Sequence, residues 1–273
     1  MTNATPAKPR IGRTLDIDAT QRIVGGQGGG QGTTFHGDDR NNAFTGTAGA
    51  DMIEAGGGDD KLYGADGDDT VRGGAGDDRM DGGRGTNQMN GGEGDDTLYD
   101  GGDGSTLQGG AGNDRIVSDG DGAWIDGGDG NDTIEAKRGE NVIWGGAGDD
   151  EIRGGEDKDV IRDSAGNDKI DGSDGDDIIA GSGGDDAVDG GAGHDFYVFG
   201  PGFGHDTFDG GEGQDGIRVM NLLFADVAVT VTEGNPIIQG ATWHANGVPF
   251  SGVITLPDGS TLHFKNVEYV VVY

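Results

Sequence analysis

An apolar residue recurs every nine positions between residues 46 and 198. The stretch divides into seventeen nine-residue copies without insertion or deletion, and the eighth position of every copy is apolar. These residues are Ile53, Leu62, Val71, Met80, Met89, Leu98, Leu107, Ile116, Ile125, Ile134, Ile143, Ile152, Ile161, Ile170, Ile179, Val188 and Tyr197. One inward side chain per nine residues, with glycines at constant offsets between them, predicts a stacked repeat architecture with a narrow core.

The clearest copies are GGAGDDRMD at 73–81, GGEGDDTLY at 91–99 and GGAGNDRIV at 109–117. The last three residues predict a short strand whose middle side chain points inward, because side chains alternate across a strand. The first six residues predict a turn, since glycine accepts positive φ values that other residues resist. The turn leaves carbonyl oxygens uncovered, and the aspartate at position six adds a carboxylate. Such hard oxygen ligands, in a chain without cysteine, suit calcium rather than zinc or copper.

On these residues the chain resembles the RTX family of type I secreted bacterial proteins. The resemblance implies an all-β fold, a right-handed parallel β-roll in which two copies make one turn, closed by a small β cap at the C-terminal end. It also implies that Ca²⁺ ions lie between successive turns. Each ion would be bound by carbonyl oxygens and position-six aspartates from loops two copies apart.

If odd and even copies, counted from Gly46, lie on opposite edges of such a roll, position six describes two rows of ligands. Every even copy carries aspartate there, whereas four consecutive odd copies carry Asn87, Ser105, Ala123 and Asn141. We therefore expect one uninterrupted row of calcium sites and a second row that is broken in its middle. The expected metal ligands are Asp51, Asp60, Asp69, Asp78, Asp96, Asp114, Asp132, Asp150, Asp159, Asp168, Asp177, Asp186, Asp195, Asp206 and Asp215.

The outward strand positions differ between the two sets of copies. Those of the even copies are mostly charged, as at Lys61 and Glu151, and predict a solvated face. Those of the odd copies form an apolar strip, which consists of Trp124, Val142, Trp144, Val160, Ile178, Phe196 and Val198. Because such a strip is usually covered, we expect the chain's own C-terminal segment to pack on it. An external partner is the alternative.

Basic residues accompany two tryptophans near the broken row. The group consists of Arg84, Trp124, Lys137, Arg138, Trp144 and Lys158. It would suit an acidic polysaccharide or a cell surface, as in the R-modules of mannuronan epimerases, which this chain resembles. The alternative, which we favour, is that the basic side chains neutralise loops that have lost their calcium.

The formal net charge of −33 argues against nucleic acid or an anionic membrane as partner and for cations. Residues 1–27 contain no signal-peptide-like apolar segment, and no stretch of the chain is apolar enough to span a bilayer. The resemblance instead implies export by type I secretion machinery, which reads an uncleaved C-terminal signal. We therefore expect a secreted protein, in solution or at the cell surface. The alternative is a cytoplasmic protein, whose low-affinity calcium sites would be empty.

The repeat weakens towards both ends of the chain. Residues 28–45 keep the register with Phe35 and Phe44 at position eight, which predicts aromatic rungs that close the core. We expect an N-terminal tail or cap over 1–27, the roll over 28–218, and a β cap over 219–273 that carries the secretion signal. Pro257 to Ser260, between two apolar runs of that cap, predicts a hairpin turn.

The sequence contains neither H-E-x-x-H nor G-x-S-x-G, so we expect a non-catalytic protein. The alternative is a polysaccharide-active enzyme, or an accessory module of one, similar to alginate epimerases. One inward side chain per copy is a thin core for a glycine-rich chain, which loses much conformational entropy on folding. We therefore expect the chain to be largely unfolded without cations and to fold as calcium binds.

Overall fold

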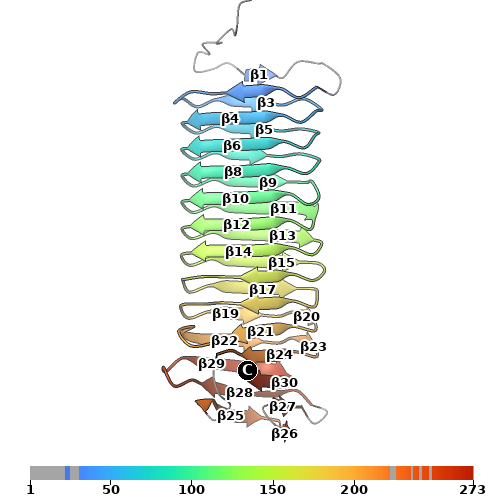
Figure 1. Cartoon of the computed structure of the whole chain (residues 1–273), viewed down its shortest axis with the longest axis vertical. Helices are drawn as coiled ribbons and strands as arrows, with labels where there is room; N and C mark the ends of the chain where they lie inside the picture. The colour runs from blue at the N-terminus through green and yellow to red at the C-terminus, as the bar shows by residue number, and fades with distance from the viewer. Residues whose placement is uncertain are drawn as a thin grey trace, which may run out of the picture.

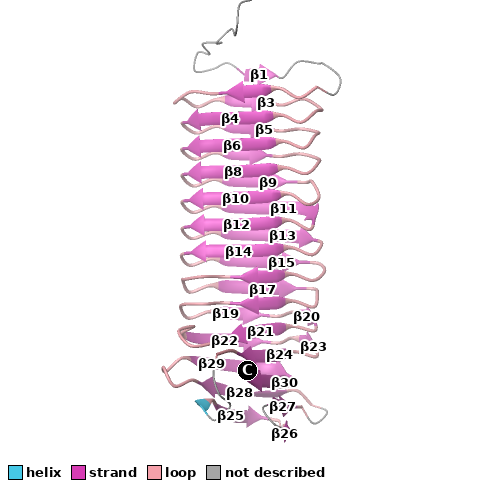
Figure 2. Cartoon of the chain, in the orientation of Figure 1, coloured by secondary structure: helices cyan, strands magenta, loops and turns pink. Residues whose placement is uncertain are grey.

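The computed structural model describes residues 22–24, 31–221, 226–234, 236–239, 242–245 and 248–272. These residues contain no α-helix. Their strands stack as rungs along one long axis, with the N-terminal strands at one end and the C-terminal strands at the other (Figures 1 and 2). The fold is an all-β parallel solenoid, which confirms the expected parallel β-roll.

Two fourteen-stranded sheets face each other across the core. The even-copy sheet contains, in spatial order, β1 (Arg22–Val24), β3 (Ala43–Thr45), β5 (Lys61–Tyr63), β7 (Arg79–Asp81), β9 (Thr97–Asp100), β11 (Arg115–Asp121), β13 (Thr133–Arg138), β15 (Glu151–Gly155), β17 (Lys169–Ser173), β19 (Ala187–Asp189), β22 (His205–Asp209), β29 (Thr261–Val267), β28 (Phe250–Thr255) and β25 (Ala228–Glu233). The odd-copy sheet contains β2 (Thr34–His36), β4 (Met52–Gly57), β6 (Thr70–Ala75), β8 (Gln88–Glu93), β10 (Thr106–Ala111), β12 (Trp124–Asp129), β14 (Val142–Ala147), β16 (Val160–Arg162), β18 (Ile178–Ala180), β21 (Phe196–Phe199), β24 (Gly216–Val219), β30 (Tyr269–Val272), β27 (Thr242–His244) and β26 (Ile237–Gln239). A two-stranded sheet pairs β20 (Ala192–Gly193) with β23 (Glu212–Gly213).

Strand pairing is parallel and advances by eighteen residues per turn through the repeat. Leu107 pairs with Ile125, and Ile125 pairs with Ile143. Even and odd copies therefore lie on separate sheets, as the two-copy turn requires. In each copy, position six lies in the loop that precedes the strand. The loops of the even copies form one edge of the roll, called the even edge, and the loops of the odd copies form the other, called the odd edge.

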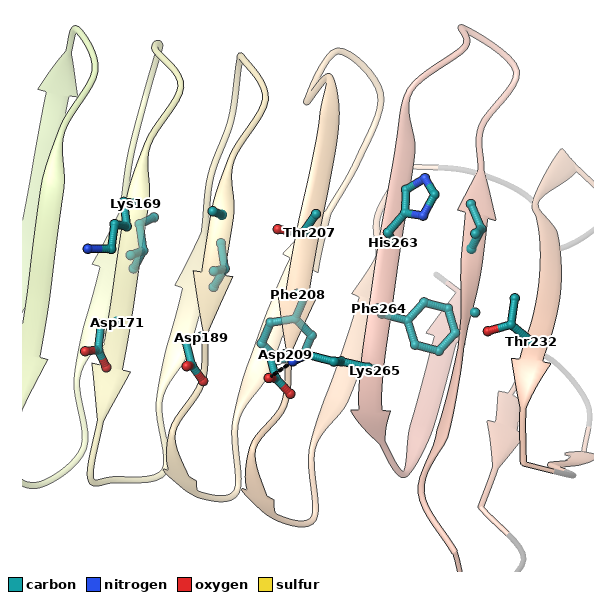
Figure 3. Close-up of a pocket in the computed structure, with 15 residues that line it drawn as sticks. Lys169, Asp171, Asp189, Thr207, Phe208, Asp209, Thr232, His263, Phe264 and Lys265 are labelled. Carbon is teal, nitrogen blue, oxygen red and sulfur yellow. Dashed lines mark ion pairs between the residues drawn. The ribbon is translucent and has the colours of Figure 1, made fainter.

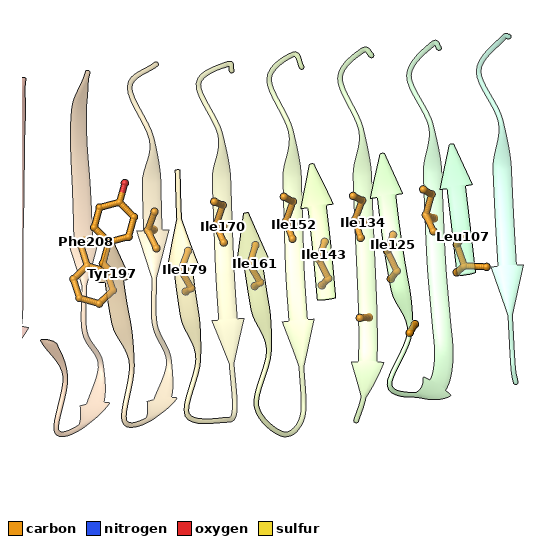
Figure 4. Packing of buried hydrophobic residues seen from close by; sticks show 14 of the residues in the cluster. Leu107, Ile125, Ile134, Ile143, Ile152, Ile161, Ile170, Ile179, Tyr197 and Phe208 are labelled. Atoms are coloured by element: carbon orange, nitrogen blue, oxygen red, sulfur yellow. The ribbon is translucent and has the colours of Figure 1, made fainter. Parts of the chain in front are cut away.

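The core contains the position-eight side chains of both sheets, which alternate along the axis (Figure 4). All seventeen are at most 4% exposed, so the nine-residue pattern identified the core correctly. Phe35 and Phe44 stack at a centroid distance of 4.5 Å, which fits the expected aromatic rungs near the N-terminal end. β1 continues the even-copy sheet beyond Phe44, within the segment that we assigned to the N-terminal tail or cap.

The C-terminal segment continues both sheets at the end of the roll. β29 pairs parallel with β22 and β30 pairs parallel with β24, after which antiparallel strands follow. The expected turn at 257–260 joins β28 and β29. On the outer face of the even-copy sheet, Lys265 of β29 forms a 2.5 Å ion pair with Asp209 of β22, in a groove that spans the junction (Figure 3).

The expectation that this segment covers the apolar strip was wrong. Its strands form hydrogen bonds with the last turns of the two sheets, because the open sheet ends offer unpaired backbone groups that a flat outer face does not. The segment meets the strip where Tyr269 packs against Phe196, at a centroid distance of 5.5 Å. Trp124 and Trp144 remain half-buried, with their rings in edge-to-face contact at 4.7 Å.

Candidate metal sites

The position-six aspartates line both edges of the roll and are buried. Each of the fifteen carboxylates expected as ligands belongs to a residue that is at most 3% exposed. Burying a carboxylate is costly unless hydrogen bonds or a cation compensate for the lost water. The partners of the two carboxylate oxygens therefore decide what these rows can bind.

One oxygen of each buried carboxylate is used to join adjacent turns. Oδ1 of Asp78 accepts a 2.8 Å hydrogen bond from the backbone N–H of Asp60, and Oδ1 of Asp96 accepts one from Asp78. The same contact recurs along the even edge from Asp60 to Asp206. These bonds hold each loop in register with the loop one turn away.

The other oxygen, Oδ2, has no hydrogen-bond partner at thirteen of the fifteen aspartates. Only Asp51 and Asp206 differ, since Oδ2 of Asp51 accepts from Thr47 N–H at 2.6 Å and that of Asp206 from the Tyr197 hydroxyl at 2.8 Å. Native proteins rarely leave a buried polar atom without a partner. The unpartnered atoms belong to Asp60, Asp69, Asp78, Asp96, Asp114, Asp132, Asp150, Asp159, Asp168, Asp177, Asp186, Asp195 and Asp215.

The glycine at position one leaves space beside most of the unpartnered oxygens, although Ala55 and Asp163 stand at this position in the copies of Asp60 and Asp168. A methyl group at Gly73 would lie 2.1 Å from Oδ2 of Asp78 and 2.7 Å from the carbonyl oxygen of Gly91, in the next turn. Gly109 stands in the same relation to Asp114 and Gly127. A carboxylate and a carbonyl therefore face one small space between turns that any larger side chain would fill. These hard oxygens fit Ca²⁺.

At Asn141, the side chain itself occupies the corresponding space between two turns, and its hydrogen bonds show which atoms line it. Its Nδ2 donates to the carbonyl oxygens of Arg138 at 3.2 Å, Gly139 at 2.6 Å and Gly154 at 3.4 Å, and to Oδ1 of Asp159 at 2.9 Å. In the broken part of the odd edge, an amide NH₂ group thus lies among three carbonyls and a carboxylate. Where aspartate stands at position six, the side chain offers no such donor.

The broken stretch changes at position one as well as at position six. Asp100, Ser118 and Ala136 replace glycine there, within the same turns that carry Asn87 to Asn141 at position six. Oδ1 of Asp100 accepts from Asn87 Nδ2 at 2.7 Å, and its Oδ2 accepts from Gly102 N–H at 3.0 Å. Neutral donors therefore satisfy both oxygens of the Asp100 carboxylate.

The rows of carboxylates are electrostatically unfavourable without a cation. Burial raises the pKa of Asp132 to about 7, the hydrogen bond from Asp114 N–H lowers it, and the charges of Asp150 and Asp114 raise it further. Burial also raises the pKa of Asp96 and Asp177 to about 7. Cations between the turns would remove both the desolvation cost and the repulsion.

The basic and aromatic residues expected to bind polysaccharide lie in loops and on the outer face of the odd-copy sheet, and several have partners within the chain. Lys137 Nζ lies 2.7 Å from Oδ1 of Asp119, and Arg138 Nη2 donates to the Asp119 carbonyl oxygen at 2.6 Å. Both cations thus bind a loop of their own edge, in agreement with local neutralisation. Trp124 and Trp144 pair with each other on the outer face of the odd-copy sheet. The two other basic residues, Arg84 and Lys158, are exposed in separate loops.

One residue that our sequence analysis did not identify stands beside the even row. Asp163 replaces glycine at position one of an even copy and is 2% exposed. Burial and the nearby carboxylates of Asp168 and Asp150 raise the pKa of Asp163 far above its ordinary value. An acidic residue at a position that is otherwise mostly glycine was the signal that could have revealed it.

Comparison with known families agrees with this geometry. The sequence model of the RTX calcium-binding nonapeptide repeat, which spans four copies, matches residues 36–71, 63–98, 90–122, 126–161 and 162–197. No curated protein matches the chain. The likeness to the R-modules of mannuronan epimerases therefore stays an interpretation of the sequence alone.

Proposed function

The chain belongs to the RTX calcium-binding nonapeptide-repeat family, and we propose that it is a secreted, non-catalytic β-roll that folds as calcium fills the spaces between its turns. As a calcium-binding repeat protein, it would bind each ion through position-six carboxylates and backbone carbonyls of neighbouring loops. The two rows of buried, unpartnered Oδ2 atoms carry this proposal. In the proposed ligand set, the even row from Asp60 to Asp206 is continuous, and the odd row has two separate parts.

Calcium would act as a structural link between turns. The Asp60 and Asp78 carboxylates belong to successive turns of one edge, and their Oδ2 atoms have no partner. A cation between such loops would neutralise the carboxylates, engage the carbonyl oxygens and join the turns. Because the unfolded chain has no preformed site, the free energy of binding becomes free energy of folding. The domain limits that we propose are a tail or cap over 1–27, the roll over 28–218 and a C-terminal cap over 219–273.

Secretion is supported by the calcium dependence that this arrangement implies. Sites of this kind would be empty at cytosolic calcium and filled outside the cell. The chain could then pass through type I secretion machinery unfolded, with its signal in the C-terminal segment, and fold outside. In the described part of the chain, no helix is long and apolar enough to cross a membrane.

The test is far-UV circular dichroism of the full chain, first in chelator and then through a calcium titration, with magnesium as the control ion. We expect a cooperative, calcium-specific gain of β signal. A β spectrum that is already complete in chelator would show that packing alone holds the roll, and the calcium-coupled proposal would fail.

A second candidate function is binding of an acidic polysaccharide on the odd-copy sheet. The half-buried pair of Trp124 and Trp144 favours it, since flat aromatic surfaces pack against sugar rings. The engagement of Lys137 and Arg138 with Asp119 weighs against it. A polysaccharide-active enzyme remains the alternative from another class, and assays for uronate release and epimerisation would test it.

A further inference from the structure

Asp163 brings a third carboxylate into one space of the even edge. One carboxylate oxygen each of Asp150, Asp163 and Asp168 lies within 4.8 Å of the other two. Calcium–oxygen distances of about 2.3–2.6 Å allow two ligands of one ion to stand up to about 5 Å apart. All three carboxylates can therefore contact a single ion.

One carboxylate oxygen each of Asp150 and Asp163 faces the space beside Gly145. Oδ1 of Asp163 accepts from Ser164 N–H at 2.7 Å and from Gly146 N–H at 3.2 Å, which fixes the side chain. A methyl group at Gly145 would lie 2.6 Å from Oδ1 of Asp163 and 2.7 Å from Oδ2 of Asp150. Asp150, Asp163 and Asp168 are each at most 3% exposed, and Oδ2 of each has no hydrogen-bond partner. The three buried oxygens thus lack the donor that a protein normally supplies.

Asp100 shows that an acidic residue at position one does not by itself make a site. It is as buried as Asp163, but both of its oxygens accept hydrogen bonds, from Asn87 Nδ2 and Gly102 N–H. At Asp163 the neighbouring position-six residues are Asp150 and Asp168, whose ionised carboxylates accept hydrogen bonds but donate none. The same residue type is therefore satisfied on the odd edge and unsatisfied on the even edge.

We propose that Asp150, Asp163 and Asp168 form a tricarboxylate cation site that binds calcium more tightly than the regular sites and fills first. The inference rests on the proposed calcium function of the even row and adds a ligand that the repeat motif does not contain. Ligand charge is one of the quantities that set calcium affinity, and a third carboxylate increases the attraction for a cation in a buried space. A trivalent lanthanide of similar size gains more from the added charge than calcium does.

The test uses terbium luminescence, excited through tryptophan, in the full chain. Trp144 directly precedes Gly145 and borders the same groove as Asp163, so it is placed to sensitise an ion at this site. Terbium is added in sub-stoichiometric steps and then displaced by calcium. In the wild type we expect the first equivalent to bind in a separate, tighter phase.

Two variants remove the third carboxylate. D163N keeps the shape of the side chain, and D163G introduces the glycine that most even copies carry at this position. We expect the first phase to weaken by about tenfold or more in both. D100N is the matched control at the partnered aspartate and should leave the first phase unchanged. First-equivalent affinity that is unchanged in D163G would overturn the proposal.

Circular dichroism of the same samples separates this inference from the proposed function. A calcium-dependent gain of β signal in D163G, together with loss of the tight phase, supports both. If the wild type is fully folded in chelator, the folding proposal fails, while the terbium comparison still tests the tricarboxylate site. If D163N does not fold, D163G provides the comparison.

Discussion

Oδ1 of Asp150 accepts a 2.7 Å hydrogen bond from the backbone N–H of Asp132, one turn earlier, while Oδ2 of the same carboxylate has no partner. Each such aspartate thus has two tasks. One oxygen aligns the turns, and the other has no partner in the chain and is the proposed cation ligand.

Replacement of Asn141 by aspartate should add a calcium site to the broken odd edge. The Nδ2 atom now satisfies three carbonyls and Asp159, and N141D would replace that donor by a carboxylate. We expect one additional calcium per chain by isothermal titration calorimetry. Without a bound ion, the folded state of the variant should be less stable by about 1–3 kcal/mol, because buried acceptors lose their donor. An unchanged ion count would contradict the assignment of this space as a cation position.

A methyl group at position one should fill the proposed cation site between two turns and prevent calcium from binding there. In G109A the new atom would lie 2.3 Å from Oδ2 of Asp114 and 2.5 Å from the Gly127 carbonyl oxygen. We expect the calcium midpoint to rise and the calcium-saturated roll to lose about 1–3 kcal/mol, as in other overpacked interiors. G183A is the control, since a methyl group there meets no atom closer than 3.4 Å. Equal calcium titrations of the two variants by circular dichroism would refute the blocked-site account.

Acid should partly replace calcium as the folding agent. Without a cation, burial raises the pKa of Asp96, Asp132 and Asp177 to about 7 in the folded chain, from an ordinary value of 3.8. The folded state therefore binds more protons than the unfolded state between about pH 4 and 7, and its stability rises as the pH falls through this window.

In chelator, the β signal should thus be weak at pH 8 and grow towards pH 5. Calcium affinity should decrease over the same range, because calcium and protons compete for the carboxylates. Circular dichroism at several pH values, with and without calcium, measures both effects. A chelated chain that loses β signal on acidification would contradict the buried-carboxylate account.

The tryptophan pair provides the test of polysaccharide binding. A double variant, W124A with W144A, removes the two tryptophans of the apolar strip without touching a position-six residue. If the strip binds acidic polysaccharide, retention on immobilised alginate in calcium should fall about tenfold or more, since two aromatic contacts are lost. K137A serves as a comparison for charge, because Lys137 pairs with Asp119. Unaltered retention of the double variant would eliminate this function for the strip.

The repeat core was predictable because its cause is local and periodic. Ile125, Ile134 and Ile143 stand at nine-residue spacing with glycines between them, and coiling of the chain buries all three in one core. The two-copy turn, which the family resemblance supplied, is present in the strand pairing. The burial of the position-six aspartates likewise agrees with their place in the motif.

The placement of the C-terminal segment was not predictable in this way. Its apolar runs, which include Phe250 and Ile254, could have covered either the apolar strip or the end of the roll. Hydrogen bonding decided between them, because the last strands of a parallel roll expose backbone groups that a flat outer face does not. β29 and β30 pair with those strands.

By itself, the sequence determined the period, the inward side chains and the aspartate rows, because these features repeat with the chain and need no knowledge of distant contacts. Only the tertiary structure distinguished Asp100 from Asp163, two aspartates at the same motif position. The difference lies in their neighbours. Asp100 has Asn87, thirteen residues earlier, as a hydrogen-bond donor, whereas Asp163 lies beside the carboxylates of Asp150, thirteen residues earlier, and Asp168, five residues later. A hydrogen-bond donor satisfies one carboxylate, whereas further carboxylates surround the other, and a buried charge is stabilised only by what lies within a few ångströms of it.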